Sequence, residues 1–143
     1  MGLDNVEFRN SISVEDYNRL RKSAGWKEIE PNQARGSIEN SAFLVSVIID
    51  GETVGMGRVF TDGGHVVVIS DIVVLPQYQR KGLGKTIMNT IMDYIRNSIK
   101  PGEAVFVNLM AAKDKEPFYR KFGFVERPNK ELGAGMTQWI TLK

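Results

Sequence analysis

Apolar residues recur at helical spacing in two stretches of the chain. The first stretch begins after Ser13, a residue type that caps helix N-termini, and ends at Gly25. The second has an apolar residue at every fourth position for about four turns and ends near residues 100–102. Its repeating positions are Leu83, Ile87, Ile91 and Ile95. Both stretches are predicted to be amphipathic helices, and two shorter helices are predicted at residues 31–40 and 114–121.

Between the helices, β-branched runs and tight turns are typical of strands. Residues 42–49, 53–60 and 66–75 are such runs, separated by Asp-Gly and Asp-Gly-Gly turns. Three consecutive strands with short turns predict an antiparallel meander. Further strands are predicted at residues 6–11, 104–110, 124–126 and 136–142. We therefore predict a mixed α/β (α+β) fold with a mostly antiparallel sheet of about six to seven strands and about four helices.

The composition excludes several kinds of functional site. The 143 residues are enough for one hydrophobic core, and apolar and charged shares of 42% and 25% are typical of a globular domain. The chain has no cysteine, which excludes disulfides, thiolate zinc sites, iron–sulfur clusters and a cysteine nucleophile. His65 is the single histidine, so a metal-binding pair of histidines is excluded as well. We predict no metal site.

Charge and the length of apolar runs bear on partners and location. Nineteen basic and seventeen acidic residues give a net charge of +2, too balanced to predict binding to nucleic acid or to a membrane surface. Apolar runs such as residues 43–45 and 66–69 are far shorter than the roughly 20 residues that span a bilayer. The N-terminal residues are polar and lack the apolar core of a signal peptide. We predict no nucleic-acid partner, no membrane partner and a cytoplasmic location.

The segment 79–86 combines two glycines with three cations between a predicted strand and a predicted helix. A helix start offers free N–H groups and the positive end of the helix dipole, which together bind anions. Glycine lets an anion approach the backbone because no Cβ blocks it. The cations are Arg80, Lys81 and Lys85. We predict an anion site here, and the structural alternative is a glycine-relaxed turn with solvated cations.

Two nucleotide-binding motifs share features with this loop, and each fails at a required glycine. A P-loop needs glycine where Gln79 stands, and it belongs to a parallel sheet whose next strand ends in a magnesium-binding acid. Here an antiparallel meander precedes the loop, and residues 104–110 end without an acid. A dinucleotide fingerprint needs its third glycine where Ile87 stands. A nucleotide-binding protein is therefore the weakest of the alternatives.

The loop resembles the acetyl-CoA motif of the GCN5-related N-acetyltransferase (GNAT) family, Gln/Arg-x-x-Gly-x-Gly/Ala. The motif positions are filled by Gln79, Gly82 and Gly84. Residues 72–76 are similar to the family's fourth strand, and residues 118–124 are similar to its second signature. The three features occur in the family's order, so the resemblance implies a single N-acetyltransferase domain of GNAT-like fold over residues 1–143.

The resemblance implies acetyl-CoA as co-substrate and assigns residues to it. The pantetheine arm would pair with backbone groups of the fourth strand, and the pyrophosphate would lie on the amides of the loop, which Gln79 would brace. The implied cofactor-binding residues are Ile72, Val73, Val74, Gln79, Arg80, Lys81, Gly82, Leu83, Gly84, Lys85 and Thr86. No metal is implied.

The implied reaction moves an acetyl group from acetyl-CoA to a primary amine by direct attack, with no covalent acyl-enzyme. By resemblance, Tyr119 is the general acid for the CoA thiolate, and the backbone N–H of Val74 donates to the oxyanion. The base stays open. Asp71 is the first candidate, and Glu28 and ordered water are the alternatives.

The family's acceptor pocket implies Trp26, Glu28 and Met136 as substrate-binding residues, because aromatic and acidic groups suit a cationic amine. The acceptor would be a small-molecule or peptide amine. Packing of the tryptophan at the edge of the core is the structural alternative. A non-catalytic acyl-CoA-binding sensor or regulatory module is the alternative function, and an exposed last strand would permit a homodimer.

Overall fold

The computed structural model describes residues 5–142. The chain divides into two compact units, Met1–Leu109 and Met110–Lys143. The described part of the first unit contains the sheet and three α-helices, and that of the second contains one α-helix. The single domain over residues 1–143 stays a prediction.

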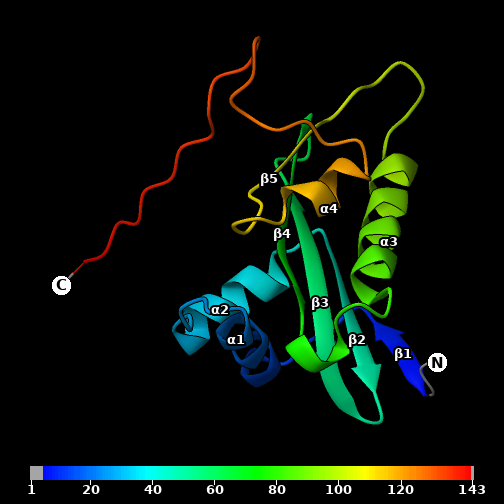
Figure 1. The fold of residues 1–143 in the computed structure, drawn as a ribbon, viewed down its shortest axis with the longest axis vertical. Coiled ribbons are helices and arrows are strands. Elements are labelled where there is room, and N and C mark those ends of the chain that lie inside the picture. The colour runs from blue at the N-terminus through cyan, green and yellow to red at the C-terminus, as the bar shows by residue number, and fades with distance from the viewer. Residues whose placement is uncertain (1–4, 143) are drawn as a thin grey trace. The chain divides into compact units, whose positions relative to one another are not determined.

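The first unit is built on a five-stranded sheet whose strand order follows the chain (Figure 1). Its strands are β1 (Val6–Arg9), β2 (Phe43–Ile49), β3 (Glu52–Thr61), β4 (Val66–Val74) and β5 (Phe106–Leu109). Neighbours from β1 to β4 are antiparallel, whereas β5 lies parallel to β4. A parallel neighbour needs a long crossover, which α3 (Leu83–Ser98) supplies. The predicted mixed α/β class with a mostly antiparallel sheet is confirmed.

Helices cover both faces of this sheet (Figure 1). Helices α1 (Val14–Ser23) and α2 (Pro31–Glu39) lie on one face, and α3 lies on the other. The Ser13 side chain caps α1 by accepting a 3.1 Å hydrogen bond from the N–H of Asp16. A single 3-10 turn, η1 (Pro76–Tyr78), follows β4. The three helices predicted in this unit are all present.

The close approach of α3 to the sheet depends on Gly57 of β3. Ile87 and Ile91 of α3 are fully buried. A Cβ built on Gly57 would lie 2.6 Å from the Cδ1 atom of Ile72, 2.8 Å from Ile87 and 2.9 Å from Ile91. Isoleucine side chains of α3 and β4 therefore pack directly on the glycine backbone, and a Cβ there would force them to shift.

We expect Gly57→Ala to lower the free energy of unfolding by about 1–3 kcal/mol, the usual cost of overpacking a core. Denaturant unfolding followed by circular dichroism measures the change. Gly36→Ala on α2 is the matched control, because a Cβ there meets no atom within 4 Å. Alanine is the better helix former, so the control is expected to hold or gain stability. A Gly57→Ala protein as stable as wild type would contradict the packing argument.

Strand β4 contains a β-bulge opposite Gly57. At this point of the ladder, β3 has one residue, Gly57, where β4 has two, Asp71 and Ile72. Asp71 takes the left-handed conformation, with φ +56°. The extra residue breaks the alternation of side chains, so Asp71 turns toward α1 while Ile72 faces α3.

Strand β5 covers only the first part of β4. It pairs with residues 66–69, and no described strand of this unit pairs with residues 70–74 on the same side. On its other side β4 stays paired with β3 as far as Val74. An unpaired strand edge presents free N–H and C=O groups to which an extended ligand can add.

The second unit contains α4 (Glu116–Arg120), the helix predicted at residues 114–121. The strands predicted at residues 124–126 and 136–142 are wrong, because residues 124–142 form neither helix nor strand. The sheet thus has five strands instead of six to seven. β-propensity alone does not make a strand, since its backbone groups need a partner, and the described residues of this unit contain no strand to supply one.

Candidate functional site

Residues 79–86 form the loop between η1 and α3 together with the first turn of α3. Two of these residues have left-handed backbone, Arg80 with φ +64° and Gly82 with φ +84°. No atom lies within 4 Å of the position that a Cβ would take on Gly82. Glycine is therefore favoured at this N-cap by the backbone angle and not by crowding.

The amides of residues 80–85 have no hydrogen-bond partner among the described residues. The first amide of α3 that is bonded belongs to Thr86, whose N–H and Oγ1 both donate to the carbonyl of Gly82 at 3.0 Å. A run of free N–H groups therefore stands at the positive end of a 16-residue helix. This is the geometry of an anion site.

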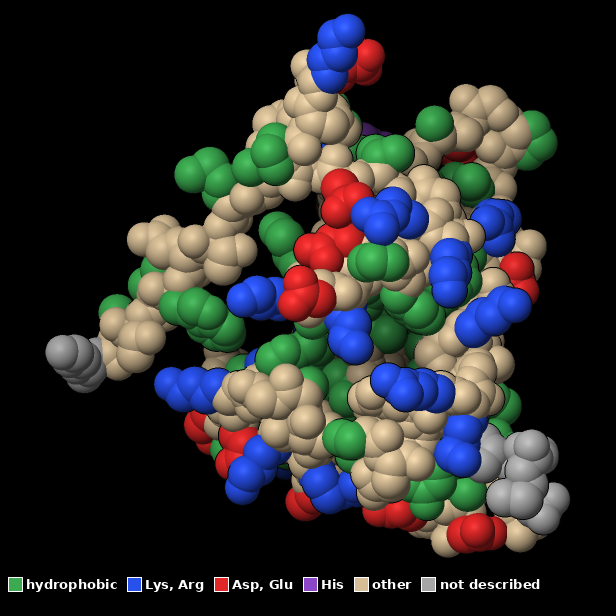
Figure 2. Space-filling view, in the orientation of Figure 1, with side chains coloured by type: hydrophobic (Ala, Val, Ile, Leu, Met, Phe, Trp, Pro, Cys, Tyr) green, Lys and Arg blue, Asp and Glu red, His purple; other side chains and the backbone are tan. Residues whose placement is uncertain are grey.

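Three exposed cations surround these amides, namely Arg80, Lys81 and Lys85. On the face drawn in Figure 2, Lys and Arg side chains are interspersed with acidic and hydrophobic ones. The net charge of the whole chain, +2, does not mark the loop as a binding site. What marks it is the combination of free amides, a helix N-terminus and local cations.

Gln79 joins the loop to the end of β4. Its Nε2 donates a 2.9 Å hydrogen bond to the carbonyl of Val74, which is the kind of bracing contact that the family resemblance implies. The N–H of Leu75 bonds back to the carbonyl of Val54 on β3 at 2.8 Å. Successive N–H groups of extended backbone point to opposite sides, so the N–H of Val74 points away from β3, toward the open edge.

The residues predicted for the pantetheine arm lie on that open edge. Ile72, Val73 and Val74 are the last three residues of β4, beyond the last pair with β5. The anion loop and the open edge follow each other directly along the chain and are tied together through Gln79. Their roles in cofactor binding stay predictions.

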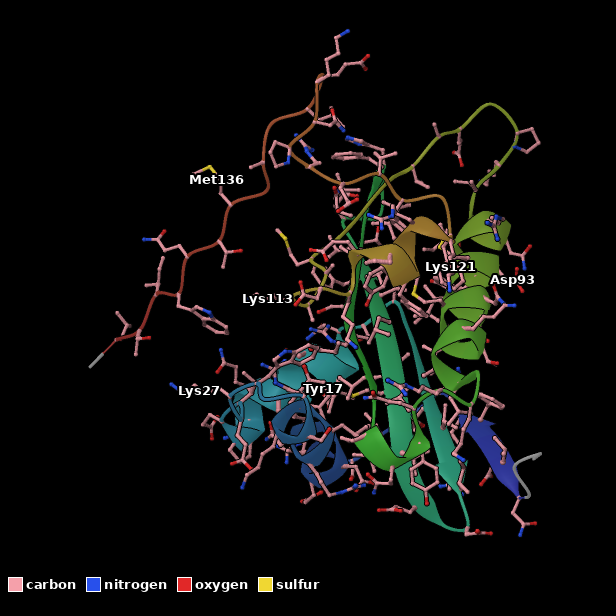
Figure 3. The ribbon with its side chains drawn as sticks, viewed as in Figure 1. Tyr17, Lys27, Asp93, Lys113, Lys121 and Met136 are labelled. Atoms are coloured by element: carbon pink, nitrogen blue, oxygen red, sulfur yellow. The ribbon has the colours of Figure 1, made fainter. Side chains whose placement is uncertain are left out.

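Asp71 lies at the centre of a buried cluster of charged groups. Its side chain is 5% exposed and accepts a 2.8 Å bond from Nη1 of Arg21 and a 2.7 Å bond from Nε of Arg58. The hydroxyl of Tyr17, labelled in Figure 3, donates to the same carboxylate at 2.5 Å. Burial, followed by this bond to a carboxylate, raises the pKa of Tyr17 to about 12. Both oxygens of Asp71 are thus engaged.

Asp71 is a candidate residue from the sequence, whereas its three partners were not predicted. Tyr17 fitted the apolar face of a predicted helix, and Arg21 follows it by one turn on α1. Arg58 interrupts a buried stretch of β3. An arginine flanked by buried residues in a strand is a signal for a buried ion pair, and it could have indicated the cluster.

Two of the predicted acceptor residues lie in the connection between α1 and α2. The Trp26 ring stacks on the Arg21 guanidinium, with 5.4 Å from Cζ to the ring centroid. Glu28 is exposed. The third, Met136, lies in the second unit outside any helix or strand and is 89% exposed (Figure 3).

Tyr119 lies on α4 of the second unit. Its ring packs edge-on against Phe118 at 5.0 Å and against Phe124 at 6.5 Å between centroids. Burial raises the pKa of the Tyr119 hydroxyl to about 12. The phenol therefore stays protonated well above neutral pH, as an acid must before it acts.

A cavity of about 500 Å³ lies at the far end of α3 from the loop, between that helix end and the turn joining β3 to β4. Its lining includes His65, Tyr94, Lys100 and Glu103. None of the predicted site residues lines it.

Within residues 5–142, no three His, Cys, Asp or Glu side chains gather in a way that would hold a metal ion. No helix in the same range combines the length and the apolar character needed to cross a bilayer.

Sequence comparison decides the family. The family model described as "Acetyltransferase (GNAT) domain" matches residues 12–139. The chain belongs to the GNAT family. The resemblance read from the loop, β4 and α4 is thereby confirmed, and the chain carries an N-acetyltransferase domain. GNAT enzymes in general use acetyl-CoA.

Individual GNAT relatives agree. The chain is 27% identical over 141 residues to the uncharacterized N-acetyltransferase ycf52 of Pyropia yezoensis, covering 91% of this chain and 79% of that one. A crystal structure from Staphylococcus aureus, described as a probable acetyltransferase, shares 35% identity with a TM-score of 0.84, covering 94% and 99%. A GNAT family protein of Streptococcus pneumoniae shares 25% identity with a TM-score of 0.75, covering 97% and 98%.

Proposed function

We propose that the protein transfers an acetyl group from acetyl-CoA to a primary amine by direct attack, without a covalent acyl-enzyme. The observation that carries the proposal is the loop of residues 79–86, with its free amides tied through Gln79 to the open end of β4. In this proposal the pyrophosphate lies on the amides of residues 80–85, and the pantetheine amides pair with residues 72–74.

At the thioester carbon, the transfer makes one bond and breaks one. The acceptor loses a proton, since an ordinary lysine-like ammonium has a pKa of about 10.4, and its nitrogen then attacks the thioester carbon. The N–H of Val74 donates to the oxygen that becomes negative, which its direction toward the open edge supports. The carbon–sulfur bond then breaks, and Tyr119 gives its proton to the CoA thiolate, an assignment supported by the family resemblance. The attacking nitrogen loses its second proton to solvent as the amide forms, and the Tyr119 phenolate takes a proton back from solvent.

The contacts of Asp71 weigh against its assignment as the base. Two guanidiniums and a hydroxyl engage both of its oxygens, so it would have to leave an ion pair to take a proton. Among the three candidates we therefore favour Glu28 or ordered water over Asp71. Asp71→Asn compared with Glu28→Gln, each assayed for turnover and for melting temperature, separates a proton acceptor from a structural carboxylate.

Calorimetric titration with acetyl-CoA and with ATP, followed by CoA release over a panel of amines, tests the function. We expect acetyl-CoA to bind, ATP not to bind at the same concentration, and at least one amine to release CoA. Tight acetyl-CoA binding without CoA release on any amine would favour the sensor or regulatory module. Binding of ATP alone would overturn the assignment of the loop.

Charge at the loop gives a graded prediction. We expect Arg80→Ala and Lys85→Ala each to weaken acetyl-CoA binding by about two- to fivefold at low salt, because exposed charges contribute little individually. The loss is expected to shrink as salt rises, since the Debye length falls from about 10 Å at 0.1 M to 3 Å at 1 M. Lys22→Ala, an exposed cation on α1, removes the same charge as a control. An equal effect of all three variants would show that the loop cations act only through the overall charge of the protein.

A further inference from the structure

We propose that the acceptor amine also carries an anionic group, a carboxylate or a phosphomonoester, which Arg21 and Arg58 bind. This inference rests on the proposed function and narrows its substrate class. It starts from the charge of the cluster around Asp71, where two guanidiniums share one carboxylate. The three side chains carry a net charge of +1 while being only 11%, 12% and 5% exposed.

Each of the two arginines keeps one donor group free. Arg21 uses Nη1 for Asp71 and Nε for the carbonyl of Lys27. Arg58 uses Nε for Asp71 and Nη1 for the carbonyl of Ser37 and the hydroxyl of Ser41. Neither Nη2 has a partner among the described residues. Since no fully buried side-chain nitrogen there lacks a partner, neither Nη2 group is completely shielded from solvent.

The two guanidiniums are held in place before any ligand arrives. Bonds to Asp71 fix both, and aromatic rings flank them: Trp26 lies over Arg21 and Phe60 over Arg58, each 5.4 Å from Cζ to the ring centroid. A guanidinium keeps its charge at any working pH and binds carboxylate or phosphate oxygens through paired N–H groups. Two fixed and nearly dry guanidiniums with one compensating carboxylate are therefore suited to an anion.

The position of the cluster relates it to the proposed reaction. The bulge turns Asp71 to the α1 side of the sheet, and the next three residues along β4 are those proposed for the pantetheine arm. Trp26, implied independently as an acceptor residue, contacts the same arginine. The positive cluster repels an ammonium group and attracts an anion. An acceptor with both groups would thus bind its anionic end here and direct its amine elsewhere.

Matched pairs of amines test the substrate class on the wild-type protein. The pairs are glycine and glycinamide, β-alanine and β-alaninamide, 4-aminobutyrate and 4-aminobutanamide, and phosphoethanolamine and ethanolamine. We expect kcat/KM to favour the anionic member of at least one pair by about tenfold or more, the effect of a charge-assisted hydrogen bond. The phosphoethanolamine pair tells phosphate from carboxylate recognition.

The outcomes separate the two proposals. Turnover with equal or better use of every neutral member overturns this inference and leaves the proposed function standing. Acetyl-CoA binding without CoA release on any amine overturns both. A separate readout uses carboxylates without an amine, such as propionate and butyrate, which we expect to compete with the acceptor and not with acetyl-CoA. If no carboxylate of any chain length competes with the acceptor, the result counts against the arginine site.

Variants place the effect on the arginines. We expect Arg21→Gln to raise KM for the anionic acceptor by about 10–100-fold, with a smaller change in kcat and a much smaller rise in KM for the neutral partner of the pair. Arg21→Lys keeps the charge without the fork and is expected to recover part of the loss. Arg19→Gln on the same helix is the matched control, because its guanidinium bonds Asp16 and Thr53 instead. Equal losses on the anionic and neutral acceptors would show that Arg21 only holds the fold together.

Discussion

A Gly82→Val protein is expected to lose acetyl-CoA binding by about 10²–10⁴-fold while keeping its fold. Gly82 holds a left-handed backbone with φ +84°, which a β-branched residue adopts only under strain. Relief of that strain would rotate the peptide planes of the loop and turn its free amides away from a shared anion. Losing two hydrogen bonds to a charged group, at about 1.5–3 kcal/mol each, accounts for the range. Isothermal titration calorimetry measures the affinity directly.

Gly63→Val provides a strict control for this variant. Gly63 lies in the turn between β3 and β4 with φ +82°, and no atom lies within 4 Å of the position that its Cβ would take, so the strain is the same. The loop of residues 79–86 is untouched in this variant. We expect matched melting temperatures for the two proteins and wild-type affinity for Gly63→Val. If a folded Gly82→Val protein binds acetyl-CoA normally, the proposal that the pyrophosphate binds this loop is wrong.

The helices and the meander could be predicted because local rules determine them. The four-residue spacing from Leu83 to Ile95 predicts a buried helix face, and those residues are buried against the sheet. Ser13 caps α1 as its residue type predicts. The loop could likewise be predicted from its glycines alone, since Gly82 takes the left-handed backbone angle that glycine permits.

The bulge and the charge cluster could not be predicted, because they depend on contacts between distant segments. Nothing within residues 66–75 marks Asp71 as an extra residue, and its effect appears only when β3 lies alongside. Tyr17 meets Asp71 across 54 positions of sequence, which no local periodicity reports. The strands predicted at residues 124–126 and 136–142 failed for the same reason, since strand formation depends on a partner.

The hydroxyl of Tyr119 is expected to contribute about 10²–10⁴-fold to turnover, the usual range for general acid catalysis. Tyr119→Phe keeps the ring and its packing against Phe118 and Phe124, so only the proton donor is lost. Acetyl-CoA affinity is expected to change little. Tyr94→Phe is the control, because it removes a hydroxyl that donates to the carbonyl of Ala42 at 3.2 Å, outside the proposed site. It is expected to cost some stability and no turnover.

The raised pKa of Tyr119 fixes the shape of the pH profile. Burial favours the neutral phenol over the phenolate, which raises the pKa of Tyr119. The contribution of the neutral phenol to the free energy of unfolding is therefore complete below about pH 10 and is lost as pH rises toward about 12. The wild-type rate is therefore expected to rise as the acceptor amine deprotonates and to show no fall near pH 10, where an ordinary tyrosine ionises. The phenylalanine variant is expected to keep the rise at its reduced rate. If turnover of the variant on its best amine is within about threefold of wild type, Tyr119 has only a packing role and solvent is the acid.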